Sequence, residues 1–243
     1  QHPEYAVRVI LHGLEGAIEG KTYAGGLMQP MKEQSDQWIS DVVSYIRNGL
    51  SNDASFVTPQ QVAAIRANTN KQAGMYKFEA LLKQVPMEFV PDQSWKFYAT
   101  HTASTRVGGN ASPKSAFNYE GWSTGKTQEK DMVFQVEFPS EYTLSEFHFT
   151  STSGFKRGQR PAAGVTPEFT HTYPRNLIIE ASTNGSDWKL VQANVKGTQG
   201  DNIVAMTPTR TKFLRLKLAE GVSAAADDIT PWSMRGMKIF GLR

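Results

Sequence analysis

The 243-residue sequence contains no cysteine. Disulfides, thiol nucleophiles, zinc ribbons and thioether attachment of haem are therefore excluded for this polypeptide by itself. Long hydrophobic runs are also missing, because no segment approaches the roughly 18 apolar residues that a membrane-spanning helix needs. We therefore expect no membrane span.

The chain also lacks a large excess of charge of either sign. The 26 basic and 23 acidic residues leave a formal net charge of +3, and the basic residues are scattered along the chain. This balance does not indicate a nucleic-acid partner. The motifs of a nucleophile elbow, a metalloprotease helix, a P-loop and a dinucleotide site are absent, and no pair of carboxylates has supporting context. We therefore predict that these residues are not an enzyme.

The first part of the chain shows the periodicity of helices. In SDQWISDVVSYIRNGL, Ser35 is a natural N-cap and apolar residues follow at helical spacing. In FVTPQQVAAIRANT, Thr58 is the cap and Gln61 completes a capping box. PEYAVRVILHGL and MYKFEALLKQ are two further predicted helices. Residues 1–85 are thus predicted to form a small, all-α domain.

From Trp95 onward the period changes to two. DMVFQVEF alternates in hydrophobicity, and LSEFHFTST follows as a second strand after a break at Pro139. A hairpin turn at Asn184–Gly185 interrupts NLIIEASTNGSDWKLVQ, and KFLRLKL alternates again. Short strands with long loops predict an all-β sandwich over residues 95–243. Residues 86–94 have no period and are the predicted linker, so the fold class is α and β in separate domains.

Residues 95–243 also resemble a known family. The segments that carry the resemblance are WKFYATHTAS, AFNYEGWSTG, MVFQVEFPSEYTLSEFHF, YPRNLIIEASTNGSDWKLV, TPTRTKFLRLKLAEG and PWSMRGMKIFG. In this order they resemble the discoidin or coagulation factor 5/8 type C family, which overlaps carbohydrate-binding module family 32. The resemblance implies an eight-stranded jelly roll whose ligands bind loops at one end.

The family resemblance also raises the question of calcium. Many members hold a structural calcium with an aspartate in an A-F-D-G turn and a glutamate just before the last strand. The corresponding positions here read Asn118–Tyr119 and Arg235–Gly236. Calcium prefers charged oxygen ligands, so we expect no bound calcium.

A sugar site needs an exposed aromatic ring for the pyranose face and polar groups for the hydroxyls. The long segment SGFKRGQRPAAGVTPEFTHTYPR offers such groups between two strands, although a solvated or interdomain loop is an equally good interpretation of its charges. The predicted glycan-binding residues are Phe155, Lys156, Arg157, Arg160, His171 and Trp232. Aromatic residues at strand patterns are usually core, which is the competing interpretation for Trp232 and the expectation for Trp122, Phe134 and Trp188.

The helical part resembles the C-terminal half of a class I c-type cytochrome over about residues 1–70. The resemblance is carried by RVILHGLEG, KTYAGGLMQPM and SDQWISDVVSYIRNGL. In that family a methionine in such a turn ligates the haem iron, and Met28 falls at this position, with Met31 as the alternative. Both could instead be flexible gap fillers in a packed surface. Haem c would also require a Cys-x-x-Cys-His segment from outside this chain.

Together these patterns predict the non-catalytic C-terminal region of a larger bacterial protein that is secreted, periplasmic or on the cell surface. The sandwich loops would bind carbohydrate, next to the remnant of a haem-containing electron-transfer domain. The expected partners are a glycan and the other domains of the full-length protein. Two alternatives stay open: electron transfer by a cytochrome that a missing segment completes, and a protein-docking module that binds no sugar.

Overall fold

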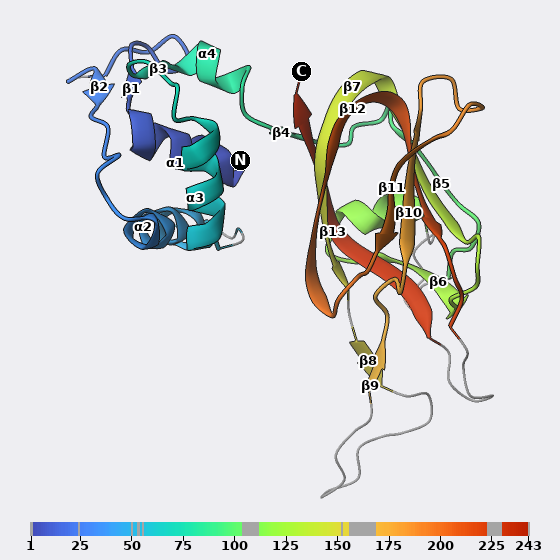
Figure 1. Ribbon diagram of the computed structural model, residues 1–243. Coiled ribbons are helices and arrows are strands. Elements are labelled where there is room, and N and C mark those ends of the chain that lie inside the picture. The colour runs from blue at the N-terminus through green and yellow to red at the C-terminus, as the bar shows by residue number, and fades with distance from the viewer. Residues whose placement is uncertain are drawn as a thin grey trace, which may run out of the picture. The chain divides into compact units, whose positions relative to one another are not determined.

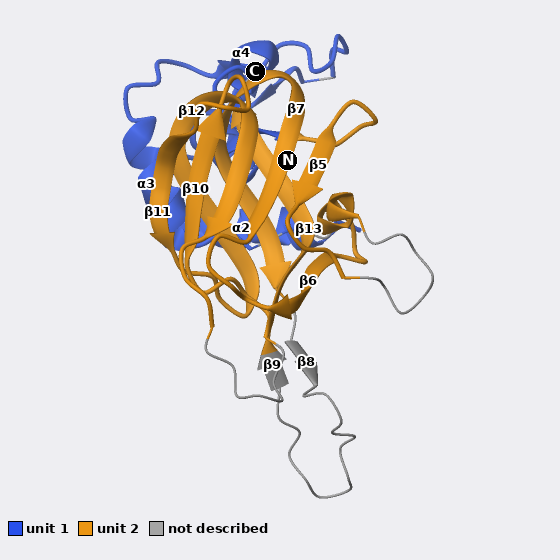
Figure 2. Cartoon of the chain, turned by 90° about the vertical axis from the view of Figure 1, so that its right-hand side faces the viewer, with its two compact units in different colours: residues 1–88, 242–243 blue, residues 89–241 orange. Residues whose placement is uncertain are grey.

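The computed structural model describes residues 2–23, 25–49, 51–52, 54, 56–103, 112–151, 153–155, 169–222 and 230–242. Two compact units divide the chain, one formed by residues 1–88 with 242–243 and the other by residues 89–241 (Figure 2). Among the described residues, every helix is too short or too polar to cross a membrane.

The first unit is mainly helical. Its described elements are α1 (Pro3–His12), α2 (Asp36–Asn48), α3 (Pro59–Asn68) and α4 (Phe78–Leu82), with the two-residue strands β1 (Leu14–Glu15), β2 (Leu27–Met28) and β3 (Tyr76–Lys77) (Figure 1). The predicted N-caps are confirmed, because Ser35 Oγ accepts from the Trp38 amide and Thr58 forms a capping box with Gln61.

The three short strands form a sheet in the order β2-β1-β3. The prediction of an all-α first part is therefore wrong. A strand of two residues has no periodicity to detect, so the sequence pattern could not reveal it.

The apolar residues of the first unit form two small clusters rather than one core. The first cluster contains Val7, Ile10, Leu11, Ile39, Val43, Val57 and Val62. The second cluster contains Val9, Leu14, Tyr76, Leu81 and Val85. Helix α1 supplies residues to both clusters and so connects them.

The second unit is the β-sandwich that the sequence predicted. Its elements are β4 (Met87–Phe89), which begins in the first unit, β5 (Lys96–Ala99), the 3-10 helix η1 (Pro113–Phe117), β6 (Trp122–Thr127), β7 (Val133–Ser151), β8 (Ser153–Phe155), β9 (Phe169–His171), β10 (Leu177–Ser182), β11 (Lys189–Val195), β12 (Gly200–Leu218) and β13 (Pro231–Leu242). The main strand order is β11-β10-β12-β7-β13-β4, with β5 on β7 and β6 on β13. The predicted hairpin at Asn184–Gly185 is confirmed, with Gly185 in the left-handed region at φ 79°.

The two 19-residue strands β7 and β12 organise the sandwich. They pair antiparallel and curve around together, so that both layers share them (Figure 1). The predicted strand break at Pro139 is wrong, because β7 runs through it. Pro139 lies where the register shifts between Glu137 and Tyr142, so its missing N–H costs no regular ladder bond.

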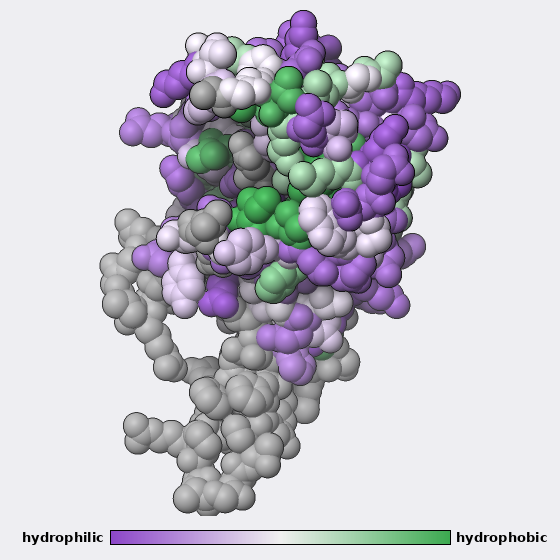
Figure 3. Space-filling model, turned by 90° about the vertical axis from the view of Figure 1, so that its left-hand side faces the viewer, coloured by the Kyte–Doolittle hydropathy of each residue, from purple (hydrophilic) through white to green (hydrophobic). Residues whose placement is uncertain are grey.

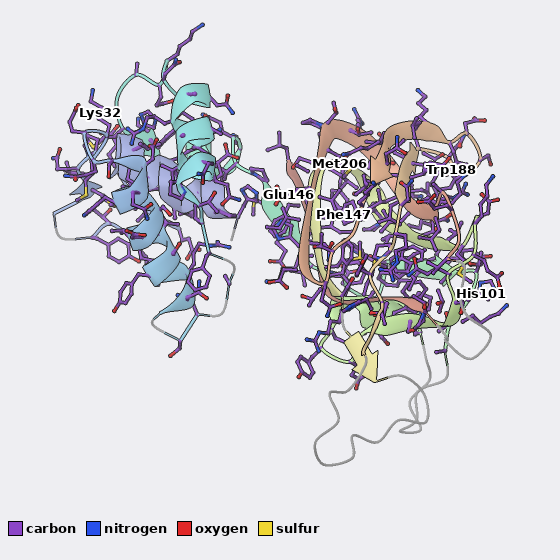
Figure 4. All side chains as sticks on the ribbon, turned by 60° about the horizontal axis from the view of Figure 1, so that its bottom comes forward. Lys32, His101, Glu146, Phe147, Trp188 and Met206 are labelled. Atoms are coloured by element: carbon purple, nitrogen blue, oxygen red, sulfur yellow. The ribbon has the colours of Figure 1, made fainter. Side chains whose placement is uncertain are left out.

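Aromatic side chains fill the space between the layers. Trp122 lies 5.1 Å from Trp232 and 5.0 Å from Phe134, measured between ring centroids. All three are buried, as are Phe147 and Met206, labelled in Figure 4. This continuous core supports the loops at both ends of the sandwich.

Candidate functional site

Strands β8 and β9 extend from one end of the sandwich (Figure 1). After β9 the chain runs through residues 172–176 into β10, next to residues 196–199 that join β11 to β12. The Gly197 amide donates to the Pro174 carbonyl at 3.0 Å. A Cβ at Gly197 would lie 2.6 Å from that oxygen, so the two loops can approach this closely only with glycine here.

The buried side chain of Gln128 fixes the same end from inside. Its Nε2 donates to the Tyr173 carbonyl at 2.8 Å, and its Oε1 accepts from the Arg175 amide at 3.2 Å. The backbone carbonyl of Gln128 also accepts from the Val222 amide at 2.8 Å. The loop that carries Tyr173 and Arg175 is therefore held by a hydrogen-bonded frame.

Four side chains gather on this frame, and we call His171, Tyr173, Arg175 and Gln199 the end cluster. The Nδ1 atom of His171 and Oε1 of Gln199 are 3.2 Å apart. The guanidinium carbon of Arg175 lies 3.8 Å from the centre of the Tyr173 ring, a cation–π distance. Arg175 Nη2 donates to the His171 carbonyl at 3.3 Å.

The end cluster combines ring surface with hydrogen-bonding groups. His171 and Gln199 are exposed, whereas Tyr173 and Arg175 are half-buried. The Nη1 atom of Arg175 is buried and has no hydrogen-bond partner within the described part of the chain. Because that atom is buried, the groups open to a ligand are the His171 imidazole, the Gln199 amide and the exposed part of the Tyr173–Arg175 pair. Such a surface can recognise a molecule with both C–H faces and oxygen acceptors.

The predicted glycan-binding residues have different outcomes. His171 is in the end cluster. The backbone of Phe155 pairs with Phe169 in the β8–β9 ribbon, but its side chain lies outside the described part of the structure. Lys156, Arg157 and Arg160 also lie outside the described residues.

The assignment of Trp232 to a sugar site is wrong. Its side chain is fully buried and packs edge-on against Trp122. A ring between the two layers cannot stack on a sugar. The competing core interpretation is therefore confirmed for Trp232, as it is for Trp122 and Phe134. Trp188 is only half-buried, and the guanidinium carbon of Arg215 lies 3.5 Å from the centre of its ring.

Tyr173 belongs to the long segment singled out in the sequence but was not among the predicted glycan-binding residues, Arg175 was expected to be structural, and Gln199 was not considered. The tripeptide Tyr173-Pro174-Arg175 at the end of a long loop was a usable signal, because aromatic and basic residues there combine ring surface and charge. Gln199 carries no such signal. It meets His171 only because two loops separated by 28 residues are brought together.

The two segments compared with a calcium site are adjacent in space. The Asn118 carbonyl accepts from the Gly236 amide at 2.9 Å, and Arg235 lies 5.3 Å from the Tyr119 ring. The Asn118 side chain accepts from the amides of Glu120 and Gly121. An arginine thus occupies the place where a carboxylate would be required, and the expected lack of calcium stays a prediction.

The methionine compared with a haem ligand is in the first unit. Met28 belongs to β2, pairs with Leu14 and is 37% exposed, and Met31 is 40% exposed. The His12 side chain has a partner of its own, since its Nε2 is 2.8 Å from Thr69 Oγ1. A role for Met28 in haem ligation stays a prediction.

No family model matches the chain, and no curated protein matches it. Similar solved structures include CpGH89CBM32-5 from Clostridium perfringens, in complex with GalNAc-β-1,3-galactose (15% identity, 61% of this chain, 96% of that chain, TM-score 0.44). They also include the family 32 CBM from C. perfringens NanJ in complex with galactose (15%, 64%, 99%, 0.45) and chitosan-binding module 1 of a Paenibacillus sp. IK-5 chitosanase/glucanase (13%, 61%, 96%, 0.43). Nothing in these comparisons supports the cytochrome resemblance.

Proposed function

We propose that the sandwich is a non-catalytic module that binds carbohydrate at the end cluster. The observation that carries the proposal is the exposed His171 imidazole, held next to the Gln199 amide and the Tyr173–Arg175 pair. Sugars present C–H faces that pack on rings, and hydroxyls that pair with amide, imidazole and guanidinium groups.

The frame beneath the end cluster supports this proposal. Gln128, Gly197 and the backbone bonds around Pro174 hold the loops, so the four side chains do not have to be ordered by the ligand. A preorganised site loses less conformational entropy on binding. Two of the similar structures are complexes with galactose and GalNAc-β-1,3-galactose, and a third is a chitosan-binding module, so these sugars are the first probes to try.

Calorimetric titration of the full chain with galactose oligosaccharides, chitosan oligomers and an acidic polysaccharide tests the proposal. We expect His171→Ala and Tyr173→Ala each to weaken binding about tenfold or more, which corresponds to about 1.4 kcal/mol. Arg175→Lys should also weaken it, because lysine keeps the charge but loses the planar stack on Tyr173.

Tyr98→Ala is the matched control, since Tyr98 is 55% exposed on β5 and outside the end cluster. An equal loss in Tyr98→Ala would contradict the proposed site. If no saccharide binds while a protein partner does, the sandwich is a docking module instead. Secretion and attachment to a larger protein stay predictions.

A further inference from the structure

A groove in the first unit lies between α2 and the segment that enters α3. Its volume is about 710 Å³, and its walls include Gln37, Asp41, Tyr45 and Asn48 from α2 and Phe56 and Thr58 from the entering segment. This volume is within the range of small-ligand sites, which is about 300–1,000 Å³. The groove belongs to a different unit from the end cluster.

Hydrogen bonds hold the two walls together. Ser40 Oγ donates to the Val57 carbonyl at 2.7 Å, and the Val57 amide donates to Ser44 Oγ at 3.0 Å. Val57 is buried in the first cluster of this unit, and Thr58 is fixed by its capping box with Gln61. The groove is therefore part of the folded unit and does not have to be formed by a ligand.

Two aromatic rings at the groove are unusually exposed. Tyr45 is 67% exposed and Phe56 is 71% exposed, although Val57 beside Phe56 is buried. Within the described residues, neither ring is paired with another ring or with a cation. Burying a large apolar side chain is worth about 1.5–3 kcal/mol, so two exposed rings at one groove forfeit considerable stability. The two rings give the groove an apolar surface on which a ligand can pack.

The polar groups of the groove select the kind of ligand. The Gln37 amide donates to Asp41 Oδ1 at 2.8 Å, and Asn48 and Thr58 add further amide and hydroxyl groups. Asp41 is the one charged residue among the described wall residues, which include no lysine, arginine or histidine. An anionic ligand would meet a carboxylate with nothing to balance it, which is unfavourable.

We propose that this groove is a second saccharide site, for a glycan segment without acidic groups. The Tyr45 and Phe56 rings take the C–H faces of the sugar units, and Gln37, Asp41 and Asn48 take their hydroxyls. The Gln37 and Asp41 side chains bond to each other, and Asn48 Nδ2 donates to the Ser44 carbonyl at 3.3 Å, so a sugar hydroxyl would pair with the remaining donors and acceptors of these groups.

Calorimetric titration of the full chain with cellohexaose and mannohexaose, as neutral probes, and with trigalacturonic acid tests the proposal. We expect a neutral probe to bind, Phe56→Ala and Tyr45→Ala each to weaken its binding about tenfold, and trigalacturonic acid to bind more weakly. Tyr23→Ala is the matched control, because Tyr23 is 56% exposed in the same unit and does not line the groove.

The variant Tyr173→Ala distinguishes binding at the groove from binding at the end cluster. That variant should leave neutral-probe binding at the groove unchanged, so the two sites can fail independently. The proposal is overturned if neither neutral probe binds, if Tyr23→Ala weakens binding as much as Phe56→Ala, or if the acidic probe binds best. It is also overturned if sedimentation shows a dimer that Phe56→Ala dissociates, because the groove would then be covered by a second copy.

Discussion

The two units bury their apolar residues in different ways. The sandwich has one core, in which Trp122, Phe134 and Trp232 are in contact across the layers. The first unit has two small clusters that share only helix α1. Of the large apolar residues that are exposed in the described part of the chain, eight lie in the first unit and five in the longer second unit.

The comparison shows where each unit has surface available for binding. A small unit buries a smaller fraction of its surface, and the first unit leaves Tyr45, Phe56 and Met28 exposed. Figure 3 shows apolar residues of this unit gathered between hydrophilic ones. The sandwich, by contrast, buries Trp122, Phe134 and Trp232 in one core, and its candidate site lies at one end, on the last residue of β9 and the loops beside it.

The largest expected effect that tests this comparison is that of Trp232→Ala on the stability of the sandwich. We expect a loss of about 3–5 kcal/mol in the free energy of unfolding of the sandwich, because a large buried ring leaves a cavity in a continuous core. Urea denaturation followed by circular dichroism measures it. Tyr119→Ala, which removes a ring that is 85% exposed, should change stability by less than about 0.5 kcal/mol. Loss of sugar binding in a stable Trp232→Phe chain would contradict the core assignment.

A smaller effect is expected at the cap of α3 in the first unit. Thr58→Ala removes the hydroxyl that accepts from the Gln61 amide, and should cost about 1 kcal/mol. Thr58→Ser keeps the hydroxyl and serves as the control in the same urea denaturation. Equal losses in both variants would show that the methyl group, and not the cap, provides the stability.

The smallest effect concerns pH. Burial, followed by the charges of Arg8, Arg66 and Lys32, lowers the pKa of His12 from its usual value of 6.5. Between the folded pKa and pH 6.5, His12 is therefore protonated in the unfolded chain but neutral in the folded chain. The stability that the folded chain has with neutral His12 is fully present above about pH 6.5, and it is lost as the pH falls through the folded pKa of His12. We expect the wild-type chain to lose more stability than His12→Gln between pH 7.5 and pH 5, measured by urea denaturation. Parallel losses in the two chains would contradict this role.

Local signals in the sequence predicted much of the fold. The caps Ser35 and Thr58, the turn at Asn184–Gly185 and the alternation through Phe134 all correspond to observed elements. Each of these signals depends on residues within a few positions of one another. They are reliable because capping bonds, left-handed turns and strand faces are short-range physical effects.

The candidate sites could be predicted only in part. His171 was predicted from its loop, but its partner Gln199 lies 28 residues further along the chain. Trp232 was assigned to a sugar site but is in the core. The sequence could not show this, because the ring that covers it, Trp122, comes from another strand. The groove at Tyr45 was also missed, since helical spacing gives no sign of which apolar residues of α2 stay exposed.

The sequence alone determined that the chain has a helical part and a β part, lacks thiol chemistry and carries its helix caps and turns at particular residues. Tertiary structure decided that β7 continues through Pro139, that Trp232 is buried, and that His171 meets Gln199. The physical reason is that local conformation depends on nearby residues, whereas burial and contact depend on which distant strands and loops pack together.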